Sequence, residues 1–366
     1  MVDTVIIEII ISLSAILNPK RFKPEITGWI FEDMGFKKFI NNPTEEEKNT
    51  WGYLPRLTVL QRVRTLVLKM EFSVLKMISG DNINEPEGNH TETIINRVRE
   101  VVENMGVRLN NEQIKKAQVL GFQPSKNFIL SEGYNPAFII NEFRKADISK
   151  KFDIDCKQYR NGGEVLQFYS NQHALCFYDK MRDDRKPAKR AFDKDRTENQ
   201  SSLFESKKPE ILRMEARLKG SKFKEVFEKI GYGNPKPTFE EVLDKSLSQK
   251  ILKYYWEYFF GDNMFLFDMR NNPQKVLNLI LAKYKDKKMN LYRVFGLVGF
   301  ILCSRDEDGI IGMRNVVSLY KPKNNWSKTK KWLEDFSKDL DKSYLHGFIK
   351  DIEVQLDKFE PLKLST

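Results

Sequence analysis

The segment LVLKMEFSVLK occupies residues 66–76, and a similar segment, ILRMEARLKG, occupies residues 211–220. Successive side chains of a β-strand point to opposite faces of a sheet. In both segments this alternation places large apolar residues on one face and a single glutamate, Glu71 or Glu215, on the other. Lysine or arginine lies next to each glutamate on that face. The pattern predicts two strands of an antiparallel sheet with one buried face and one polar face.

Further segments rich in β-branched and aromatic residues, with turn residues between them, predict the other strands. Together with the two segments above, the predicted strands cover residues 4–12, 56–78, 117–130, 164–169, 173–180 and 210–219. Apolar residues at helical spacing predict helices over 91–107 and 136–147, the second with Pro136 in its first turn. We therefore expect an α+β domain built on an antiparallel sheet over residues 1–232.

After about residue 220, apolar residues recur at helical spacing. The segments concerned are 221–233, 238–261, 272–287, 291–306 and 325–342. The Gly- and Pro-rich stretch GYGNPKPT at 231–238 predicts a boundary. We therefore expect an α-helical C-terminal domain over residues 233–366, with a DNA-binding or accessory role.

The chain has 366 residues, a formal net charge of +11 and a pI near 9.2. Such a cationic chain suits a polyanionic partner, and nucleic acid fits better than a membrane because no amphipathic anchor is evident. An inert basic surface is the alternative. Cys156, Cys176 and Cys303 lack CxxC spacing, which argues against a zinc site or a disulfide framework and is typical of a reducing cytosol.

The apolar segment VDTVIIEIIISLSAIL at residues 2–17 resembles a signal peptide only superficially. Asp3 precedes the apolar run, Glu8 interrupts it, and no basic region comes before it. The segment is also too short to span a bilayer. We interpret it as a buried strand and expect no membrane association.

The stretch LCFYDKMRDD at residues 175–184 places Tyr178 and Lys180 on one face of a third predicted strand. The three polar faces have two interpretations. One is a solvated sheet face with cross-strand salt bridges, which is common. The other is a Mg²⁺ or Mn²⁺ site whose neighbouring cations hold phosphates. A tyrosine, with a reference pKa of about 10, becomes a nucleophile there only if a metal, base or cation field removes its proton.

Other chemistries lack the residues that they need. His90, His173 and His346 are the only histidines, and no pair has metal-ligand spacing. No P-loop and no GxGxxG motif occurs. The combination of acids, cations and a tyrosine therefore favours phosphodiester transesterification over a Ser-His-Asp hydrolase.

Several segments resemble, in the same order and over nearly the whole chain, the phage and plasmid replication initiators of the filamentous-phage gene II/X type. The segments are MVDTVIIEII, LKMEFSVLKMISGDN, AQVLGFQPSKNFIL, CFYDK, LRMEARLKGSKFKEVF and YYWEYFFGDNMFLFD. The resemblance implies a rolling-circle initiator, a metal-dependent endonuclease and strand transferase that nicks one strand at a replication origin. Its tyrosine becomes linked to the 5′-phosphate, and the free 3′-hydroxyl primes synthesis.

By this resemblance Tyr178 is the nucleophile, Lys180 is a cation beside it, and Glu71 and Glu215 are acidic positions near a Mg²⁺ or Mn²⁺ ion. Relatives often have aspartate or histidine before the SKN motif, where this chain has Gln123. A glutamine oxygen can bind a hard cation but adds no charge, so metal affinity is expected to fall. A contact between Gln123 and DNA is the other interpretation. A catalytically silent, origin-binding regulator descended from such an enzyme is therefore the alternative function.

The cations predicted to bind DNA are Lys69, Lys126, Arg213, Arg217, Lys328, Lys330 and Lys331. The last three lie in YKPKNNWSKTKKW (320–332), which contains no acid, and a solvated helix face is the alternative there. The resemblance implies origin DNA, double- and single-stranded, as partner, with a host helicase and polymerase, in the cytoplasm of a bacterial host cell. The oligomeric state is not predicted.

Overall fold

The structure of the 366-residue chain is a computed structural model. It describes residues 1–27, 36–62, 65–79, 83–85, 90–146, 148, 151–158, 163–184, 209–261, 273–285, 290–304, 309–320, 326, 328, 331 and 346–363. Within these ranges, no helix has the length and apolar character needed to cross a membrane.

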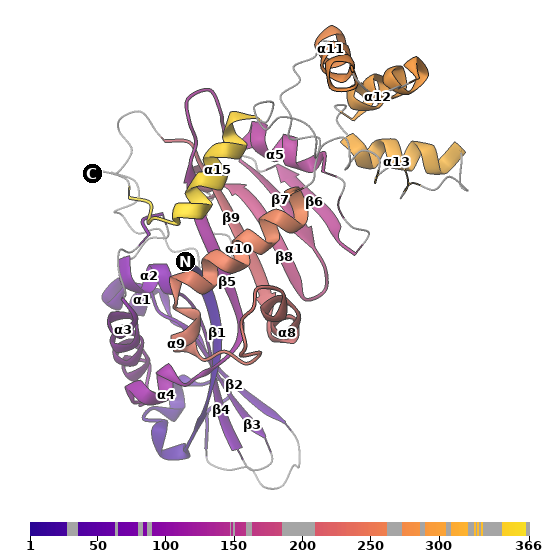
Figure 1. The fold of residues 1–366 in the computed structure, drawn as a ribbon. Helices are drawn as coiled ribbons and strands as arrows, with labels where there is room; N and C mark the ends of the chain where they lie inside the picture. Colours follow the sequence, from indigo (N-terminus) through magenta and orange to yellow (C-terminus); the bar gives the residue numbers. More distant parts are fainter. Residues whose placement is uncertain are drawn as a thin grey trace.

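An antiparallel sheet of nine described strands forms the centre of the molecule (Figure 1). The strands are β1 (Val2–Ile11), β2 (Lys37–Asn41), β3 (Arg56–Arg62), β4 (Thr65–Ser73), β5 (Gln118–Ile129), β6 (Asp153–Gln158), β7 (Glu164–Tyr169), β8 (His173–Asp179) and β9 (Ile211–Lys219). Their order across the sheet is β2-β3-β4-β1-β5-β9-β8-β7-β6. The sheet and the many helices confirm the predicted α+β class.

The two halves of the sheet repeat one strand order around the central β1–β5 pair. Outward from β1 lie β4, the last strand of the first half, then β3 and β2. Outward from β5 lie β9, the last strand of the second half, then β8, β7 and β6. β4 and β9 are therefore equivalent, and they carry the similar sequences LKME (68–71) and LRME (212–215). Glu71 and Glu215 occupy equivalent positions in this arrangement.

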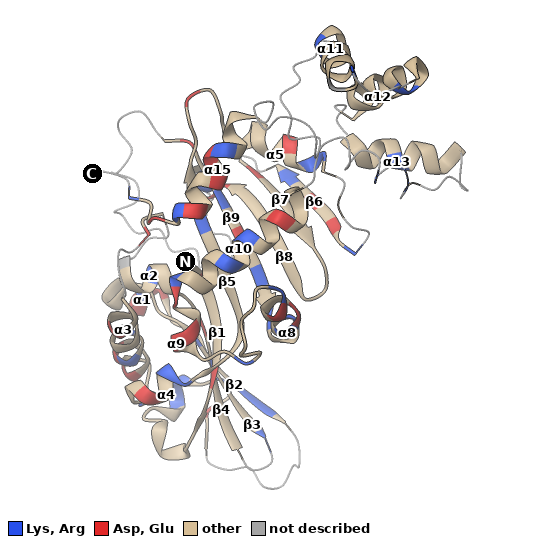
Figure 2. Ribbon diagram, viewed as in Figure 1, with Lys and Arg blue, Asp and Glu red and all other residues tan. Residues whose placement is uncertain are grey.

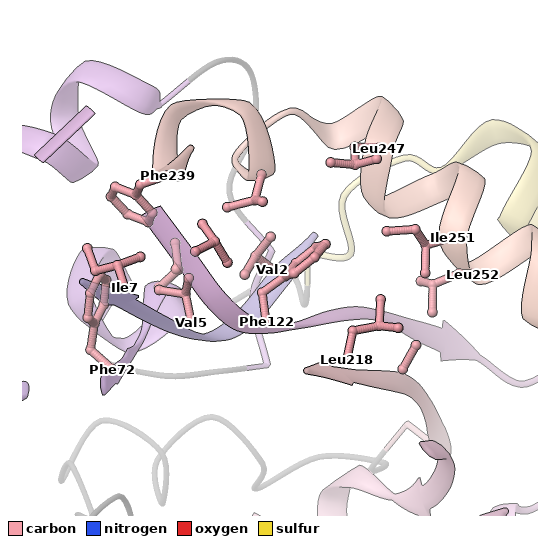
Figure 3. Close-up of a cluster of buried hydrophobic side chains, with 14 of the residues drawn as sticks. Val2, Val5, Ile7, Phe72, Phe122, Leu218, Phe239, Leu247, Ile251 and Leu252 are labelled. Atoms are coloured by element: carbon pink, nitrogen blue, oxygen red, sulfur yellow. The ribbon is translucent and has the colours of Figure 1, made fainter. Parts of the chain in front are cut away.

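Helices cover one face of the sheet. The described helices are α1 (Glu45–Trp51), α2 (Val74–Ser79), α3 (Thr91–Asn104), α4 (Asn111–Lys115), α5 (Pro136–Arg144), α6 (Lys180–Asp184), α8 (Gly220–Lys229), α9 (Phe239–Val242), α10 (Lys245–Phe260), α11 (Pro273–Lys283), α12 (Leu291–Cys303), α13 (Gly309–Tyr320) and α15 (Gly347–Lys358). The apolar sides of α3, α5, α8, α9, α10 and α15 join one face of the strands in a single large core. In Figure 3, Ile251 and Leu252 of α10 lie over Phe122 of β5 and Leu218 of β9.

Most predicted elements are present, but the helices α1, α4, α13 and α15 were not predicted. Most of the predicted helix 325–342 lies outside the described residues. The predicted strand 56–78 is a pair of strands, β3 and β4, followed by α2. β2 and β6 were not predicted because KKFIN is short and DIDCKQ is polar and largely exposed. The helix α5 begins as expected: Pro136 is its first residue, and the side chain of Asn135 accepts a hydrogen bond from the N–H of Phe138.

The predicted domain division at residues 232 and 233 does not separate two cores. Phe239 of α9, Ile251 of α10 and Phe348 of α15 are fully buried in the core of the sheet. Among the described helices, α11 and α12 form a smaller cluster of their own that includes Val276 and Leu297. The apolar stripe of α10 packs on the strands. Helical spacing of apolar residues predicts such a stripe but does not show which element it packs against.

Candidate active site

Tyr178 lies on β8, directly opposite Arg213 of β9, and on the sheet face away from the large core. Its neighbour in the chain, Phe177, points into that core. The residue is 8% exposed, and its hydroxyl donates a 3.0 Å hydrogen bond to Oε2 of Glu215. The phenol therefore faces a carboxylate that can accept its proton. We call the face that carries Tyr178, Glu215 and Arg217 the polar face.

Glu215 is the centre of the polar face and is 2% exposed. Its Oε1 accepts a 2.7 Å hydrogen bond from Nε of Arg217, and its Oε2 lies 3.9 Å from Nε of Arg213. The Arg217 side chain is 45% exposed, whereas that of Arg213 is fully buried. Figure 2 shows the lysines and arginines of β9 in blue. Within the cluster around Glu215, Arg217 is thus the cation that an incoming anion can reach.

Asp3 of β1 also belongs to the site, although the sequence did not suggest this role. Its Oδ2 lies 3.1 Å from the terminal nitrogen of Arg213, which also donates a 2.9 Å hydrogen bond to the hydroxyl of Ser125. Its Oδ1 accepts a 3.2 Å hydrogen bond from the hydroxyl of Ser73. Arg213 therefore links the carboxylates of Asp3 and Glu215 across β5. No local motif marks Asp3, because the contact depends on strand order.

The positive charges of this cluster fix the ionisation of Asp3. Burial alone would raise the pKa of Asp3, but Arg213, Lys180 and Lys76, together with the Ser73 hydrogen bond, hold it below its ordinary value. Lys180, the first residue of α6, is 1% exposed. This predicted partner of Tyr178 therefore lies near enough to Asp3 to interact with its carboxylate. An ionised Asp3 in turn helps to hold the Arg213 guanidinium in place.

Burial raises the pKa of Tyr178 well above 10, and the carboxylates of Glu215 and Asp3 raise it further, against an opposing effect of Arg213. The phenol is therefore protonated at neutral pH and needs a proton acceptor to react. Cys176 lies opposite Glu215 on β8, and burial raises its pKa to about 12. Its thiol is therefore inert as a nucleophile at neutral pH.

Glu71 does not lie beside Tyr178. It pairs with Ile6 of β1 and Arg56 of β3, whereas Glu215 pairs with Ser125 of β5. Three strand spacings and four residues along the strands separate the Cα atoms of the two glutamates, which is about 20 Å. The expectation that Glu71 and Glu215 lie near one metal ion is therefore wrong.

Gln123 lies on the polar face of β5, two residues before Ser125, and the register with β9 places it level with Arg217. On its other side, the β1–β5 register shifts next to Asp3. Gln123 is therefore between Arg217 and Asp3, and its role as a metal ligand or a DNA contact stays a prediction.

Mg²⁺ and Mn²⁺ prefer several oxygen ligands, with carboxylates supplying the negative charge. Glu215 and Asp3 are both already paired with guanidinium groups, and Glu71 lies too far away. No group of three or more His, Cys, Asp or Glu residues that could hold a metal ion occurs in the part of the chain that the structure describes. The described residues around Tyr178 therefore do not fit a bound divalent cation.

Lys126 points to the helix-covered face of β5, opposite the polar face, and is 3% exposed. Its Nζ lies 2.5 Å from Oε2 of Glu85. Oε1 of Glu85 accepts a hydrogen bond from the N–H of Asn127, and Oε2 accepts one from the N–H of Leu362. The expectation that Lys126 binds DNA is therefore wrong, because its ammonium group is buried in an ion pair. Arg213 is likewise fully buried, so the assignment of a direct DNA contact to it is also corrected.

The remaining predicted DNA contacts have different surroundings. Lys69 is half-buried on β4 and lies opposite Glu8 of β1. Lys328 and Lys331 are exposed helical residues, and Lys330 lies outside the described residues. Lys69, Lys328 and Lys331 are therefore on other elements than the cluster at Tyr178. Among the predicted cations that the structure describes, only Arg217 joins that cluster with an exposed side chain.

No protein-family model matches the chain, and no curated protein matches it. Among solved structures, the chain is similar to a rolling-circle replication initiator protein from Geobacillus stearothermophilus, with 10% sequence identity and a TM-score of 0.35. The match covers 85% of this chain and 98% of that chain.

Proposed function

We propose that the protein initiates rolling-circle DNA replication by nicking one strand at an origin and becoming linked to the new 5′-phosphate through Tyr178. The observation that carries this proposal is the hydrogen bond from the Tyr178 hydroxyl to the buried carboxylate of Glu215. The same carboxylate holds Arg217, whose exposed guanidinium suits a DNA phosphate. The net charge of +11 favours a polyanionic partner as well.

In the proposed step, the Tyr178 oxygen attacks the phosphorus atom and its proton passes to Glu215. The bond between tyrosine oxygen and phosphorus forms as the bond from phosphorus to the 3′-oxygen breaks, and the 3′-oxygen takes a proton from water. Arg217 binds a non-bridging phosphate oxygen and stabilises the charge that develops there. The buried Arg213 interacts with both Asp3 and Glu215 and so fixes the position of the Glu215 carboxylate.

Reversal of this step with a second 3′-hydroxyl gives strand transfer, and the free 3′-hydroxyl primes a polymerase. Origin DNA, a host helicase and a host polymerase are the partners that follow from this role. A requirement for Mg²⁺ or Mn²⁺ stays a prediction of the sequence resemblance, and a metal titration of nicking tests it.

A silent origin-binding regulator is the second candidate. It is favoured by the 8% exposure of Tyr178 and by the high pKa of its phenol. In such a protein, the Tyr178–Glu215 hydrogen bond and the charge of Arg213 beside Glu215 would be structural, and DNA would be bound but not cut.

The test uses a supercoiled plasmid that carries the DNA flanking the gene of this chain, incubated with the full-length protein and Mg²⁺ or Mn²⁺. Nicked plasmid and a covalent protein–DNA adduct on a denaturing gel are expected. Tyr178→Phe removes the attacking oxygen and keeps the ring, so the variant should fold and form no adduct. Adduct formation by Tyr178→Phe at the wild-type rate would contradict the assignment, and DNA binding without any adduct in the wild type would favour the silent regulator.

A further inference from the structure

Tyr169 lies on the same face of the sheet as Tyr178 but at the other end of the β7–β8 hairpin. Val165 of β7 pairs with Tyr178, and Tyr169 pairs with Ala174. The two positions are four residues apart on β7, which corresponds to about 13 Å along the strand. Tyr169 is 37% exposed, and it is the large apolar side chain with the greatest exposure on the described strands β7, β8 and β9.

Two exposed cations accompany Tyr169. Ala174 pairs with Arg217 on its other side, so Arg217 and Tyr169 flank a small side chain on one face. Lys219, two residues further along β9, is also exposed and points to this face. Asp153, the partner of Tyr169 on β6, lies on the side away from both cations.

The hairpin that carries Tyr169 is held firmly. The N–H of Ser170 donates a 2.9 Å hydrogen bond to the carbonyl oxygen of His173 and so closes the turn. The carbonyl oxygen of Gln172 accepts a 3.1 Å hydrogen bond from the N–H of Lys219, which ties the turn to β9. The ring of Tyr169 therefore projects from a rigid hairpin beside two cations, the arrangement of a preorganised ligand site.

We propose that Tyr169, Arg217 and Lys219 form a binding site for single-stranded DNA, in which the Tyr169 ring stacks on a base, Lys219 holds the adjoining phosphate, and Arg217, which reaches back to Glu215, holds the scissile phosphate. Exposed aromatic rings beside a cationic track are the usual means of binding single strands without sequence readout. At about 3.4 Å or more per nucleotide, the 13 Å to Tyr178 corresponds to a few nucleotides. The site extends the proposed function, on which it rests, by placing the strand next to the scissile phosphate.

The position of Tyr169 also argues against a role for this residue as a second nucleophile. Its hydroxyl is too far along the strand to reach the phosphate that Tyr178 attacks. No described carboxylate on its β9 side corresponds to Glu215, because Arg217 and Lys219 occupy that side. The affinity for single-stranded DNA should therefore depend on the ring of Tyr169 and not on its hydroxyl.

The experiment measures the affinity of full-length protein for a fluorescein-labelled oligo(dT) by anisotropy at fixed low salt. Tyr169→Leu should weaken binding by about 5- to 150-fold, the equivalent of about 1–3 kcal/mol for one stacked base. Tyr169→Phe should bind within about twofold of the wild type. Tyr292→Leu, which removes an 85% exposed tyrosine on α12, is the matched control and should leave affinity unchanged. A thermal unfolding curve of each variant confirms folding.

Wild-type affinity in Tyr169→Leu would overturn the stacking site, and so would an equal loss in Tyr169→Phe, which would assign the effect to the hydroxyl. The result is separate from the test of the proposed function. Weakened binding by Tyr169→Leu in a protein that forms no adduct would support the stacking site and reject the nicking activity. If the wild type forms an adduct through Tyr178 but Tyr169→Leu binds oligo(dT) as tightly as the wild type, the nicking activity is supported and the stacking site is rejected. Absence of oligo(dT) binding by the wild type would also overturn the stacking site.

Discussion

Glu71 and Glu215 occupy equivalent positions in the two halves of one sheet, but their surroundings differ. Glu215 is 2% exposed and accepts a hydrogen bond from the hydroxyl of Tyr178, whereas Glu71 is half-buried and lies opposite Arg56 in the β3–β4 register. The two positions therefore form a natural pair for comparison. Any effect that follows from a strand glutamate in general should appear at both, and any effect that follows from Tyr178 should appear only at Glu215.

The first prediction uses this pair. Glu215→Gln removes the proton acceptor of Tyr178 and should lower the rate of adduct formation by at least about 100-fold, since general-base catalysis typically contributes about 10²–10⁴-fold. Glu71→Gln should react at nearly the wild-type rate. The measurement is single-turnover adduct formation at saturating DNA, with urea unfolding of both variants as the control. An equal loss of adduct-formation rate in the two variants would show that Glu71 also takes part in the reaction.

The second prediction concerns Gln123. Gln123→Asp adds a negative charge between Asp3 and Arg217, where the Arg217 guanidinium is proposed to hold a phosphate. Single-stranded DNA affinity should fall by about two- to tenfold at low salt, and the loss should shrink as salt rises. Gln118→Asp, at the exposed first residue of β5, is the control. If Gln123→Asp instead lowers the Mn²⁺ concentration needed for half-maximal nicking, residue 123 is a metal ligand and the site near Tyr178 does bind a metal ion.

The third prediction concerns the buried ion pair of Lys126 and Glu85. Lys126→Met leaves the Glu85 carboxylate buried without its cation, which should lower the free energy of unfolding by about 3–5 kcal/mol. Lys253→Met, which breaks the exposed pair with Asp357, should change it far less. Urea unfolding measures both. At a temperature where Lys126→Met is folded, its DNA affinity should equal that of the wild type, and a reduced affinity would show that Lys126 does contact DNA.

The fourth prediction is a pH dependence of stability. Burial and the nearby charge of Lys222 lower the pKa of His173 to about 4 in the folded chain, and its Nδ1 lies 2.6 Å from the hydroxyl of Tyr255. The unfolded chain, with a His pKa near 6.5, binds the proton more readily. The contribution of His173 is therefore complete above about pH 6.5 and is lost as the pH falls toward about 4.

His173→Gln removes this titration. Between pH 7 and pH 5, the unfolding free energy of the variant should fall less than that of the wild type. The pKa of Asp3 is lowered from an ordinary value near 3.8, so protonation of Asp3 changes the unfolding free energy only at lower pH and not between pH 7 and pH 5. A parallel decrease in the two proteins would mean that His173 is not the responsible group.

The alternation of apolar and polar residues was sufficient to predict most of the strands and the two faces of β4 and β9. It could not predict which strands are neighbours. LKME and LRME have the same pattern, so both glutamates were expected at one site, whereas the strand order places β1 and β5 between them. The contact of Asp3 with Arg213 joins residues that are 210 positions apart, and only the assembled sheet brings them together.

The burial of polar side chains was also not predictable. The pattern around Lys126 resembles that of any strand cation, and its partner Glu85 lies in a turn-rich stretch without strand or helix periodicity. Charged residues are rarely buried unless they are paired, and the sequence does not show the pair. Tyr178 could be proposed as a candidate from the sequence because an apolar run ends there with a cation two residues later and because its segment resembles the one that carries the nucleophile. Its hydrogen bond to Glu215 depends on the β8–β9 register and could not be predicted.

The central pairing of β1 with β5 makes the two halves of the chain mutually dependent. β1 has 10 residues and β5 has 12, so a fragment that contains only one half would leave a long strand edge without its partner. Such an edge can pair with other copies of the fragment and promote aggregation. β1 is also synthesised more than 100 residues before β5, which requires a slow, non-local pairing step during folding. Neither half is therefore suited to expression by itself, despite their matching strand orders.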